Sequence, residues 1–183
     1  MDTENQATLK ENKGNENPMK LIKVAKLTLN VGAGKSEDML KKGLKLLGKL
    51  SSVKPVTTTS KKRIPGWGLR PGLKIGCKVT IRKDVNELLK KLLASKSNLL
   101  SIKNFDQSGN FSFGIHEYID IPGLEYDPDL KIMGLEVAIS LERPGFRIKR
   151  RKLFKKKVGA NHLITKEDAI NFVKEKFNVE VEA

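Results

Sequence analysis

The segment GAGKS at residues 32–36 has the residue types of a phosphate-binding loop, because glycines precede a lysine and a hydroxyl. A P-loop also requires a glycine five residues before its Gly-Lys-Ser, and Leu29 occupies that position here. The spaced-glycine pattern of dinucleotide-binding loops fails as well, since Glu37 stands at its last glycine. The segment is therefore interpreted as a tight turn from a strand into a helix, whose amino-terminal end could still approach a phosphate group.

Few other side chains could carry catalysis. His116 and His162 are far apart in the sequence, and each is interpreted as a surface or packing residue. Cys77, the only cysteine, lies beside apolar residues at the start of a strand, which favours a buried, inert thiol. The eight acidic residues between positions 104 and 142 lie mostly beside turns, and solvation explains them better than a carboxylate pair. Without metal-ligand spacing, we predict no metal, no cofactor and no enzymatic activity.

The charge of the chain is both large and segregated. There are 36 basic and 21 acidic residues, giving a formal net charge of +15. Residues 39–83 contain 13 basic residues and residues 143–166 contain 10, and neither stretch contains an acidic residue. A surface that only keeps a protein soluble mixes both signs. The segregation therefore indicates a polyanionic partner, with nucleic acid favoured over an anionic membrane.

The sequence carries no sign of a membrane segment or a secretion signal. No apolar run approaches the roughly 20 residues that a transmembrane helix needs. Residues 1–18 are mostly polar and lack the apolar centre of a signal peptide. We expect a soluble, cytoplasmic protein with a disordered polar tail at residues 1–19 and a single domain at residues 20–183.

Alternating and helical apolar patterns interleave irregularly along that domain. Strands are predicted at residues 21–31, 56–60, 75–82, 111–115 and 135–141. Helices are predicted after Ser36, after a capping-box-like start at Asp84, and after a cap at Thr165. Pro55 is expected to end the first helix. This order favours an α+β fold: a mostly antiparallel sheet with helices packed on one face, plus basic loop extensions.

Two of the predicted strands carry matched polar faces. On each strand apolar residues alternate with polar ones, and the polar sets are Lys26-Thr28-Asn30 and Lys78-Thr80-Arg82. If these strands are neighbours, one sheet face offers cations and short hydrogen-bonding groups side by side. That arrangement suits the phosphates, ribose hydroxyls and shallow groove of A-form RNA. An ordinary solvent-facing surface is the alternative. The strands carry no aromatic pair, which disfavours readout by stacking of single-stranded bases.

Two basic segments lie outside these strands. The first is a Gly- and Pro-rich loop at residues 61–72, whose candidate contacts are Lys61, Lys62, Arg63, Trp67 and Arg70. Its tryptophan could anchor the loop in the core or stack on a base or sugar. The second segment, residues 143–157, has nine basic residues in fifteen, and its candidate RNA contacts are Arg147, Lys149, Arg150, Arg151 and Lys152. Pro144 and Gly145 argue against a continuous membrane-surface helix there.

Several segments occur in an order typical of one known family. They are LTLNVGAG, VKPVTTTSKKRIPGWGLRPGLKIGCKVTIR, FDQSGNFSFGIHEY, PGLEYDPDLKIMGLEVAISLERPGFRI and DAINFVKEKFNVEV. They resemble the universal large-subunit ribosomal protein L-five family, whose members bind 5S ribosomal RNA. The resemblance runs from about residue 20 to the end of the chain. LERPGFR and the final segment resemble the archaeal and eukaryotic branch.

The resemblance implies an α+β fold and a structural, non-enzymatic role in the central protuberance of the large subunit. Implied partners are 5S rRNA, 23S-type rRNA, P-site tRNA, neighbouring large-subunit proteins and a small-subunit protein at an intersubunit bridge. Asn30 and Thr80 match family residues at the 5S contact, and residues 61–72 match the loop that approaches P-site tRNA. Val53 replaces the family's usual glutamine, which leaves that RNA contact open. Pro65 and Trp67 stand where relatives tend to have a smaller residue and Phe.

The sequence therefore predicts an RNA-binding ribosomal protein that binds 5S RNA with its polar sheet face and reaches tRNA with its basic loop. A nucleic-acid chaperone that acts by charge alone is one alternative, and an enzyme that uses the GAGKS turn is another. The ordered polar faces favour the ribosomal interpretation, because a binder acting by charge alone would not need them.

Overall fold

The computed structural model describes residues 17–182. Its main sheet has five strands in the order β2-β3-β1-β6-β5, and every neighbouring pair is antiparallel. In chain order the strands are β1 (Lys23–Gly32), β2 (Val56–Thr59), β3 (Lys74–Ile81), β5 (Phe111–Ile115) and β6 (Leu135–Glu142). All five lie where the alternating sequence patterns predict them.

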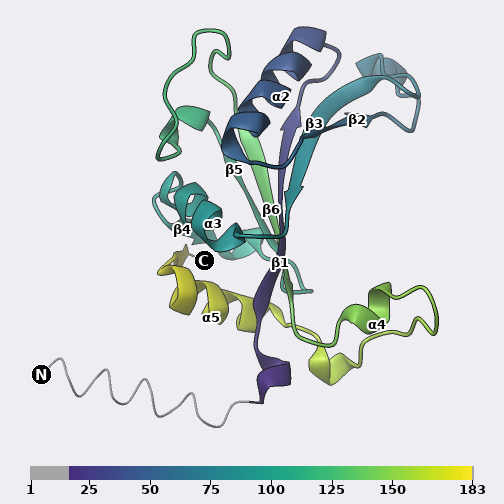
Figure 1. Cartoon of the computed structure of the whole chain (residues 1–183), viewed down its shortest axis with the longest axis vertical. Helices are drawn as coiled ribbons and strands as arrows, with labels where there is room; N and C mark the ends of the chain where they lie inside the picture. Colours follow the sequence, from purple (N-terminus) through teal and green to yellow (C-terminus); the bar gives the residue numbers. More distant parts are fainter. Residues whose placement is uncertain (1–16, 183) are drawn as a thin grey trace, which may run out of the picture.

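Three helices form a layer on one face of this sheet: α2 (Glu37–Leu50), α3 (Val85–Ala94) and α5 (Lys166–Phe177) (Figure 1). A single turn of helix, α4 (Arg147–Arg150), lies on the other side. The 3₁₀ turns are η2 (Pro18–Lys20), η3 (Pro65–Trp67), η4 (Ile102–Asn104), η5 (Tyr118–Asp120) and η6 (Ala160–His162). The predicted α+β fold, with helices packed on one face of a mostly antiparallel sheet, is confirmed.

Two short strands, β4 (Leu99–Ser101) and β7 (Glu180–Glu182), pair in parallel as a separate small sheet. They were not predicted, because three residues are too few to show an alternating pattern. Residues 1–16, most of the expected polar tail, lie outside the described residues.

The core lies between the sheet and the helix layer. Leu27, Leu29 and Val31 of β1 are at most 2% exposed, so every second residue of this central strand faces the helices. The same alternation buries Phe111, Phe113 and Ile115 on β5 and the apolar residues of β6. The opposite set of side chains on each strand is left for the other face of the sheet.

Helix α2 begins as its sequence predicts and ends earlier. The Ser36 Oγ accepts a hydrogen bond from the Met39 backbone N–H at 3.3 Å, which confirms the predicted cap. The helix ends at Leu50 because Ser51 takes an extended backbone, so Pro55 does not end it. Within the helix, a Cβ at Gly43 would come within 2.8 Å of the Cys77 Sγ, and glycine therefore lets α2 pack closely on β3.

The two other predicted helix starts have different outcomes. Asp84 takes the left-handed conformation with φ 51° and makes no side-chain cap, so the predicted capping box is wrong there. A capping side chain normally projects from an extended backbone, and a left-handed residue does not aim it at the first N–H groups. Thr165 and Asp168 do form a reciprocal capping box, with both hydrogen bonds at 3.2 Å.

Two segments project from the sheet on the side opposite the helix layer (Figure 1). One is the connection between β2 and β3, residues 61–72, called here the hairpin loop. The other is the connection between β6 and α5, residues 143–164, called here the basic extension. The sheet face between them, opposite α2, α3 and α5, is called the open face. No helix in residues 17–182 is long and apolar enough to cross a membrane.

Candidate nucleic-acid interface

The two polar strand faces lie next to each other, as predicted. Strands β1 and β3 pair directly, in a register that sets Thr28 opposite Thr80 and Asn30 opposite Lys78. The threonines and Asn30 are half-buried, and Lys78 is exposed. Because their strand neighbours are buried under the helices, these side chains belong to the open face.

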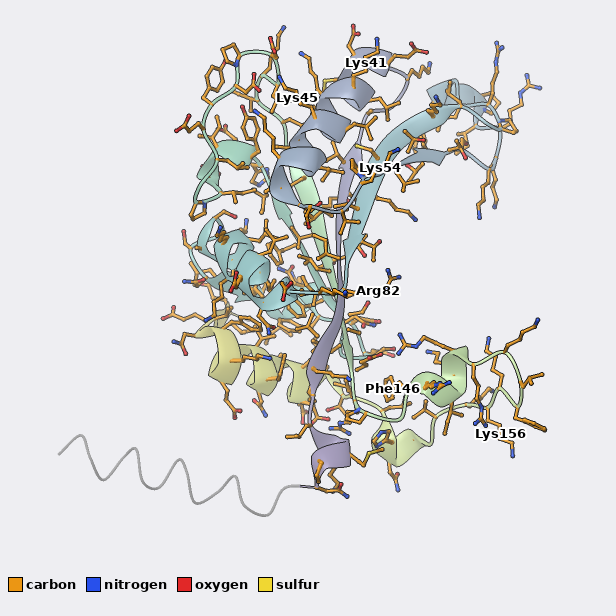
Figure 2. All side chains as sticks on the ribbon, in the orientation of Figure 1. Lys41, Lys45, Lys54, Arg82, Phe146 and Lys156 are labelled. Carbon is orange, nitrogen blue, oxygen red and sulfur yellow. The ribbon has the colours of Figure 1, made fainter. Side chains whose placement is uncertain are left out.

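Lys26 and Arg82 extend this polar surface toward the basic extension. Both are exposed, and the register of β1 and β3, continued by one residue, sets them opposite each other. Figure 2 shows Arg82 at the end of β3, between the two projecting segments. The structure therefore brings all six predicted open-face residues together, with the Thr28–Thr80 pair between the Lys26–Arg82 pair and the Asn30–Lys78 pair.

Acidic side chains of β6 share the same face, and the sequence analysis did not single them out. Glu136 pairs with Asn30 across β1 and β6, and the Asn30 Nδ2 donates a hydrogen bond to the Glu136 Oε2 at 3.2 Å. Beside this pair is a shallow hollow of ≈ 370 Å³, lined partly by Gly32, Gly114 and His116. The signal was present in the sequence, because Glu136 alternates with the buried Leu135 and Val137.

The hairpin loop holds its cations and tryptophan in solvent. Ile64 and Leu69 exchange two backbone hydrogen bonds of 3.0 Å, which close a tight loop around η3. Trp67 within it is 70% exposed, so the alternative that it anchors the loop in the core is wrong. The four predicted basic contacts are also exposed: Lys61, Lys62, Arg63 and Arg70.

The GAGKS turn contributes a cation to the hairpin loop and has no phosphate cradle. The N–H groups of Ala33 and Gly34 both donate to the Ile75 carbonyl, at 2.9 and 3.1 Å, so they are not free to surround a phosphate. Its Lys35 side chain lies against Gly68 of the hairpin loop, where any Cβ would collide with it. This confirms the interpretation of the segment as a tight turn.

The basic extension has a fixed base and an exposed, basic outer part. At the base, Arg143 donates to the Leu163 carbonyl at 3.1 Å and to the Asp168 carboxylate at 2.9 Å. Phe146 and His162 pack edge to face at 5.7 Å, which confirms His162 as a packing residue. Farther out, Lys156 lies on the part most distant from the sheet (Figure 2).

The five RNA candidates of the basic extension are all exposed, and two of them also hold protein atoms. Arg150 pairs with Glu142 of β6 at 2.7 Å, and the Arg151 Nε donates to the Phe154 carbonyl at 2.8 Å. The remaining three, Arg147, Lys149 and Lys152, make no ion pair within residues 17–182. Lys155, Lys156 and Lys157, farther along the extension, are likewise exposed and make no ion pair within the same residues.

Not every lysine of the first acid-free stretch points to the open face. Lys45 and Lys49 of α2 bind Asp127 at 3.0 and 2.6 Å, and Lys45 also binds Asp129 at 3.0 Å (Figure 2 labels Lys45). Lys49 first and Lys45 second hold the pKa of the Asp127 carboxyl well below its usual range. Asp127, whose side chain is only 15% exposed, is therefore more than a solvated turn residue, whereas Asp129 stays 81% exposed, as expected.

The described residues offer no catalytic centre. Cys77 is fully buried, and burial raises the pKa of its thiol, which confirms it as inert. His116 is exposed on the surface, as expected. Residues 17–182 contain no group of three or more His, Cys, Asp or Glu side chains that could hold a metal ion.

Two family models match consecutive parts of the chain. The model described as Ribosomal protein L5 matches residues 17–70, and a second model, which describes the C-terminus of the same ribosomal protein family, matches residues 74–172. The first match supplies β1 and β2, and the second supplies β3, β5 and β6. Strands from the two matched parts are therefore interleaved in one sheet, with β6 and β5 of the second part side by side.

Curated relatives are similar along nearly their whole length. A protein of Nanoarchaeum equitans named Large ribosomal subunit protein uL5 is 44% identical over 168 residues, which are 91% of this chain and 99% of the relative. The protein of the same name from Sulfolobus acidocaldarius is 45% identical over 167 residues, 91% of this chain and 94% of the relative. That from Sulfurisphaera tokodaii is 44% identical over 167 residues, 90% and 94%.

Proposed function

This chain belongs to the Ribosomal protein L5 family, and we propose that it holds 5S ribosomal RNA on its open face within the large ribosomal subunit. Membership makes it a structural, non-enzymatic component of the large subunit, with ribosomal RNA and neighbouring large-subunit proteins as its partners. Which ribosomal RNA it binds, and through which residues, is what we propose here. Residues 20–183 act in it as one domain, because both family matches contribute strands to the same sheet.

The observation that carries the proposal is the register of β1 and β3. It places Thr28 beside Thr80 and Asn30 beside Lys78, with no helix over them. Hydroxyl and amide groups can bond ribose hydroxyls and base edges, while Lys26, Lys78 and Arg82 bind phosphate. Half-buried neutral groups with fixed positions give the specificity that charge alone does not supply.

The hairpin loop is assigned to P-site tRNA. It stands away from the centre of the open face, so it can reach a second RNA while the sheet holds the first (Figure 1). Its exposed Trp67 offers a flat ring for a base or sugar, with Lys61, Lys62, Arg63 and Arg70 available for phosphates.

The basic extension is assigned to 23S-type ribosomal RNA. Its cations face away from the protein core and follow no strand register, which suits contact with a phosphate backbone. The rRNA contacts proposed there are Arg147, Lys149, Arg150, Arg151 and Lys152. Its position beside the open face would let it hold a neighbouring RNA segment against the bound 5S RNA.

The protein is also assigned a contact to a small-subunit protein across an intersubunit bridge. Such a contact needs a surface that the RNA leaves free. The loop between η5 and β6 fits this need, because it lies on the helix side of the sheet and exposes Tyr126 and Ile132, at 58% and 64%. This would place the chain in the central protuberance, between the 5S RNA and the other subunit.

Crosslinking within native ribosomes tests the assignment to 5S RNA. A photoreactive side chain at Thr28 or Thr80 is expected to link to 5S RNA, and one at Trp67 to P-site tRNA. A matched probe at Lys90, exposed on α3 behind the sheet, should link to neither. Links from Thr28 and Thr80 to 23S-type RNA alone would contradict the proposal. Equal links to every RNA present would favour a chaperone that acts by charge.

A further inference from the structure

Glu136 puts a carboxylate on the open face beside the proposed RNA contacts. It is exposed, and it lies on β6 opposite Asn30 of β1. A carboxylate repels phosphate, and an RNA-binding face that worked by charge alone would be weakened by it. It does not pair with a cation within residues 17–182, unlike Glu142 farther along the same strand, which binds Arg150. Its position therefore calls for a partner that donates hydrogen bonds.

The hydrogen bond between Asn30 and Glu136 fixes which atom Asn30 offers to a ligand. A carboxylate only accepts hydrogen bonds, so the Asn30 Nδ2 must face it, as the 3.2 Å contact shows. The Asn30 Oδ1 is then the free atom, and it makes no hydrogen bond within the described residues. The pair therefore presents acceptors: one amide oxygen and the remaining lone pairs of the carboxylate.

The floor beside this pair leaves room for a flat group. The shallow hollow of ≈ 370 Å³ is lined by Asn30 and Glu136 together with three glycines, Gly32, Gly114 and Gly134. At Gly32 and Gly114 a Cβ would meet nothing within 4 Å, so the missing side chains leave open space above the sheet. A nucleobase can approach the backbone there, and His116 lines the rim.

We propose that the Asn30–Glu136 pair and this hollow form a subsite for the hydrogen-bond donors of an unpaired guanine in the bound RNA. Guanine carries two adjacent N–H donors on its Watson–Crick edge, N1–H and the N2 amino group, which match the two oxygens of one carboxylate. Phosphate has only acceptors and is excluded. The subsite deepens the proposed function, since it orients the RNA: phosphates over β3 and β1, a donor-bearing base over β1 and β6.

The test uses the full chain and short RNA hairpins with one loop guanosine, the same hairpins with inosine, and 5S RNA. Inosine lacks the N2 amino group. Wild-type protein should bind the guanosine hairpin about tenfold more tightly, the range of a hydrogen bond to a charged group. Glu136→Gln should abolish that preference and weaken 5S binding by about tenfold, while binding to inosine hairpins, which offer the carboxylate only N1–H, should weaken less.

Asp120→Asn is the matched control, because it removes one exposed negative charge away from the open face and should keep the guanosine preference. Hairpins with a loop deoxyguanosine test whether the protein recognises the base or the ribose. If the preference over inosine is unchanged, the base is recognised. If the preference is lost, the 2′-hydroxyl is recognised and the assignment is overturned. Equal binding of guanosine and inosine hairpins by wild type, or tighter 5S binding by Glu136→Gln, would also overturn it.

These measurements distinguish a failure of the subsite from a failure of the proposed function. If wild type prefers 5S over unrelated RNA and Glu136→Gln behaves like wild type on every RNA, only the subsite fails. If wild type reads guanosine yet does not prefer 5S RNA, the subsite stands and the proposed function fails. Thermal unfolding of Glu136→Gln checks that the variant folds, which we expect for an exposed side chain.

Discussion

The open face and the basic extension are both surfaces for RNA, but they are built in opposite ways. On the open face the strand register fixes each group: Thr28 meets Thr80, and Asn30 lies between Lys78 and Glu136. On the basic extension nine of fifteen residues in 143–157 are basic, and all of these except Arg143 are exposed and follow no register. Exposed flexible cations bind any phosphate backbone, whereas fixed neutral groups can distinguish one RNA from another.

Separate parts of one small protein can therefore supply the charge that attracts RNA and the groups that select one RNA. Lys45 and Lys49 also show that a basic residue need not serve RNA, because they lie in the first acid-free stretch and yet bind Asp127. A count of lysines and arginines along the chain therefore overstates the surface that is available to RNA. The neutral residues Thr28, Asn30 and Thr80 are the ones that we expect to select the RNA.

The largest effect on overall affinity should come from neutralising the basic extension. Replacing Arg147, Lys149, Arg151 and Lys152 with Gln should weaken binding to 5S and unrelated RNA alike, by on the order of 10²-fold at low salt, and reduce the log–log salt slope by about three. Filter binding across a salt series measures both quantities. The matched control neutralises four exposed lysines on the helix side: Lys41, Lys90, Lys91 and Lys174. A selective loss of 5S binding would contradict this division.

A smaller but selective effect should follow from single changes on the open face. Thr80→Val or Asn30→Ala should weaken 5S binding by roughly 1–3 kcal/mol, the range of a polar group left without its partner. Binding to unrelated RNA should stay unchanged, because no charge is lost. Thr57→Val is the control, since Thr57 pairs with Cys77 and so lies on the opposite face. A loss under about 0.3 kcal/mol would show that these residues are not the site.

The hairpin loop should matter little for 5S RNA and much for tRNA. Deleting residues 61–70 should change 5S affinity by less than about threefold, because charges farther than about 10 Å are screened at moderate salt. Translation that depends on P-site tRNA should be impaired, and Trp67→Ala should reproduce part of that defect. A collapse of 5S affinity would instead show that the hairpin loop and the open face bind 5S RNA together.

The smallest effect is expected at Asp127. The pKa of its carboxyl is lowered in the folded protein, so its ion pairs stabilise the fold at pH values above 3.8, the ordinary value, and that stabilisation is lost as the pH falls through the lowered pKa. Asp127→Asn should slightly lower the midpoint of thermal unfolding at neutral pH, and the difference should shrink in strong acid. RNA affinity should not fall. Weaker RNA binding would mean that Lys45 and Lys49 are RNA contacts.

The sequence predicts the open face well because apolar and polar residues alternate along β1 and β3. The buried residues of each strand, such as Leu29 and Val79, show which residues must lie on the opposite, polar face. Alternation alone cannot show that the two strands are neighbours, because their pairing joins residues far apart in the sequence. Alternation places Glu136 on the exposed side of β6, but its pairing with Asn30, 106 residues away, could not be predicted from it.

Local backbone geometry explains the other errors. The left-handed Asp84 and the extended Ser51 depend on tertiary packing, whereas the propensities of Asp84 and Pro55 describe only what each residue favours in isolation. The exposure of Trp67 likewise depends on whether a core lies beneath the hairpin loop, which composition does not reveal.

In this protein, charge should supply affinity for RNA in general, and the open face should supply specificity for 5S RNA. The most direct test is the ratio of dissociation constants for 5S RNA and an unrelated RNA of equal length, measured with wild-type protein as salt is raised. Both affinities should fall steeply, with the log–log slope set by about −0.9 per phosphate neutralised in duplex. We expect 5S RNA to remain the tighter ligand at moderate salt. Equal affinity for the two RNAs there would contradict this expectation.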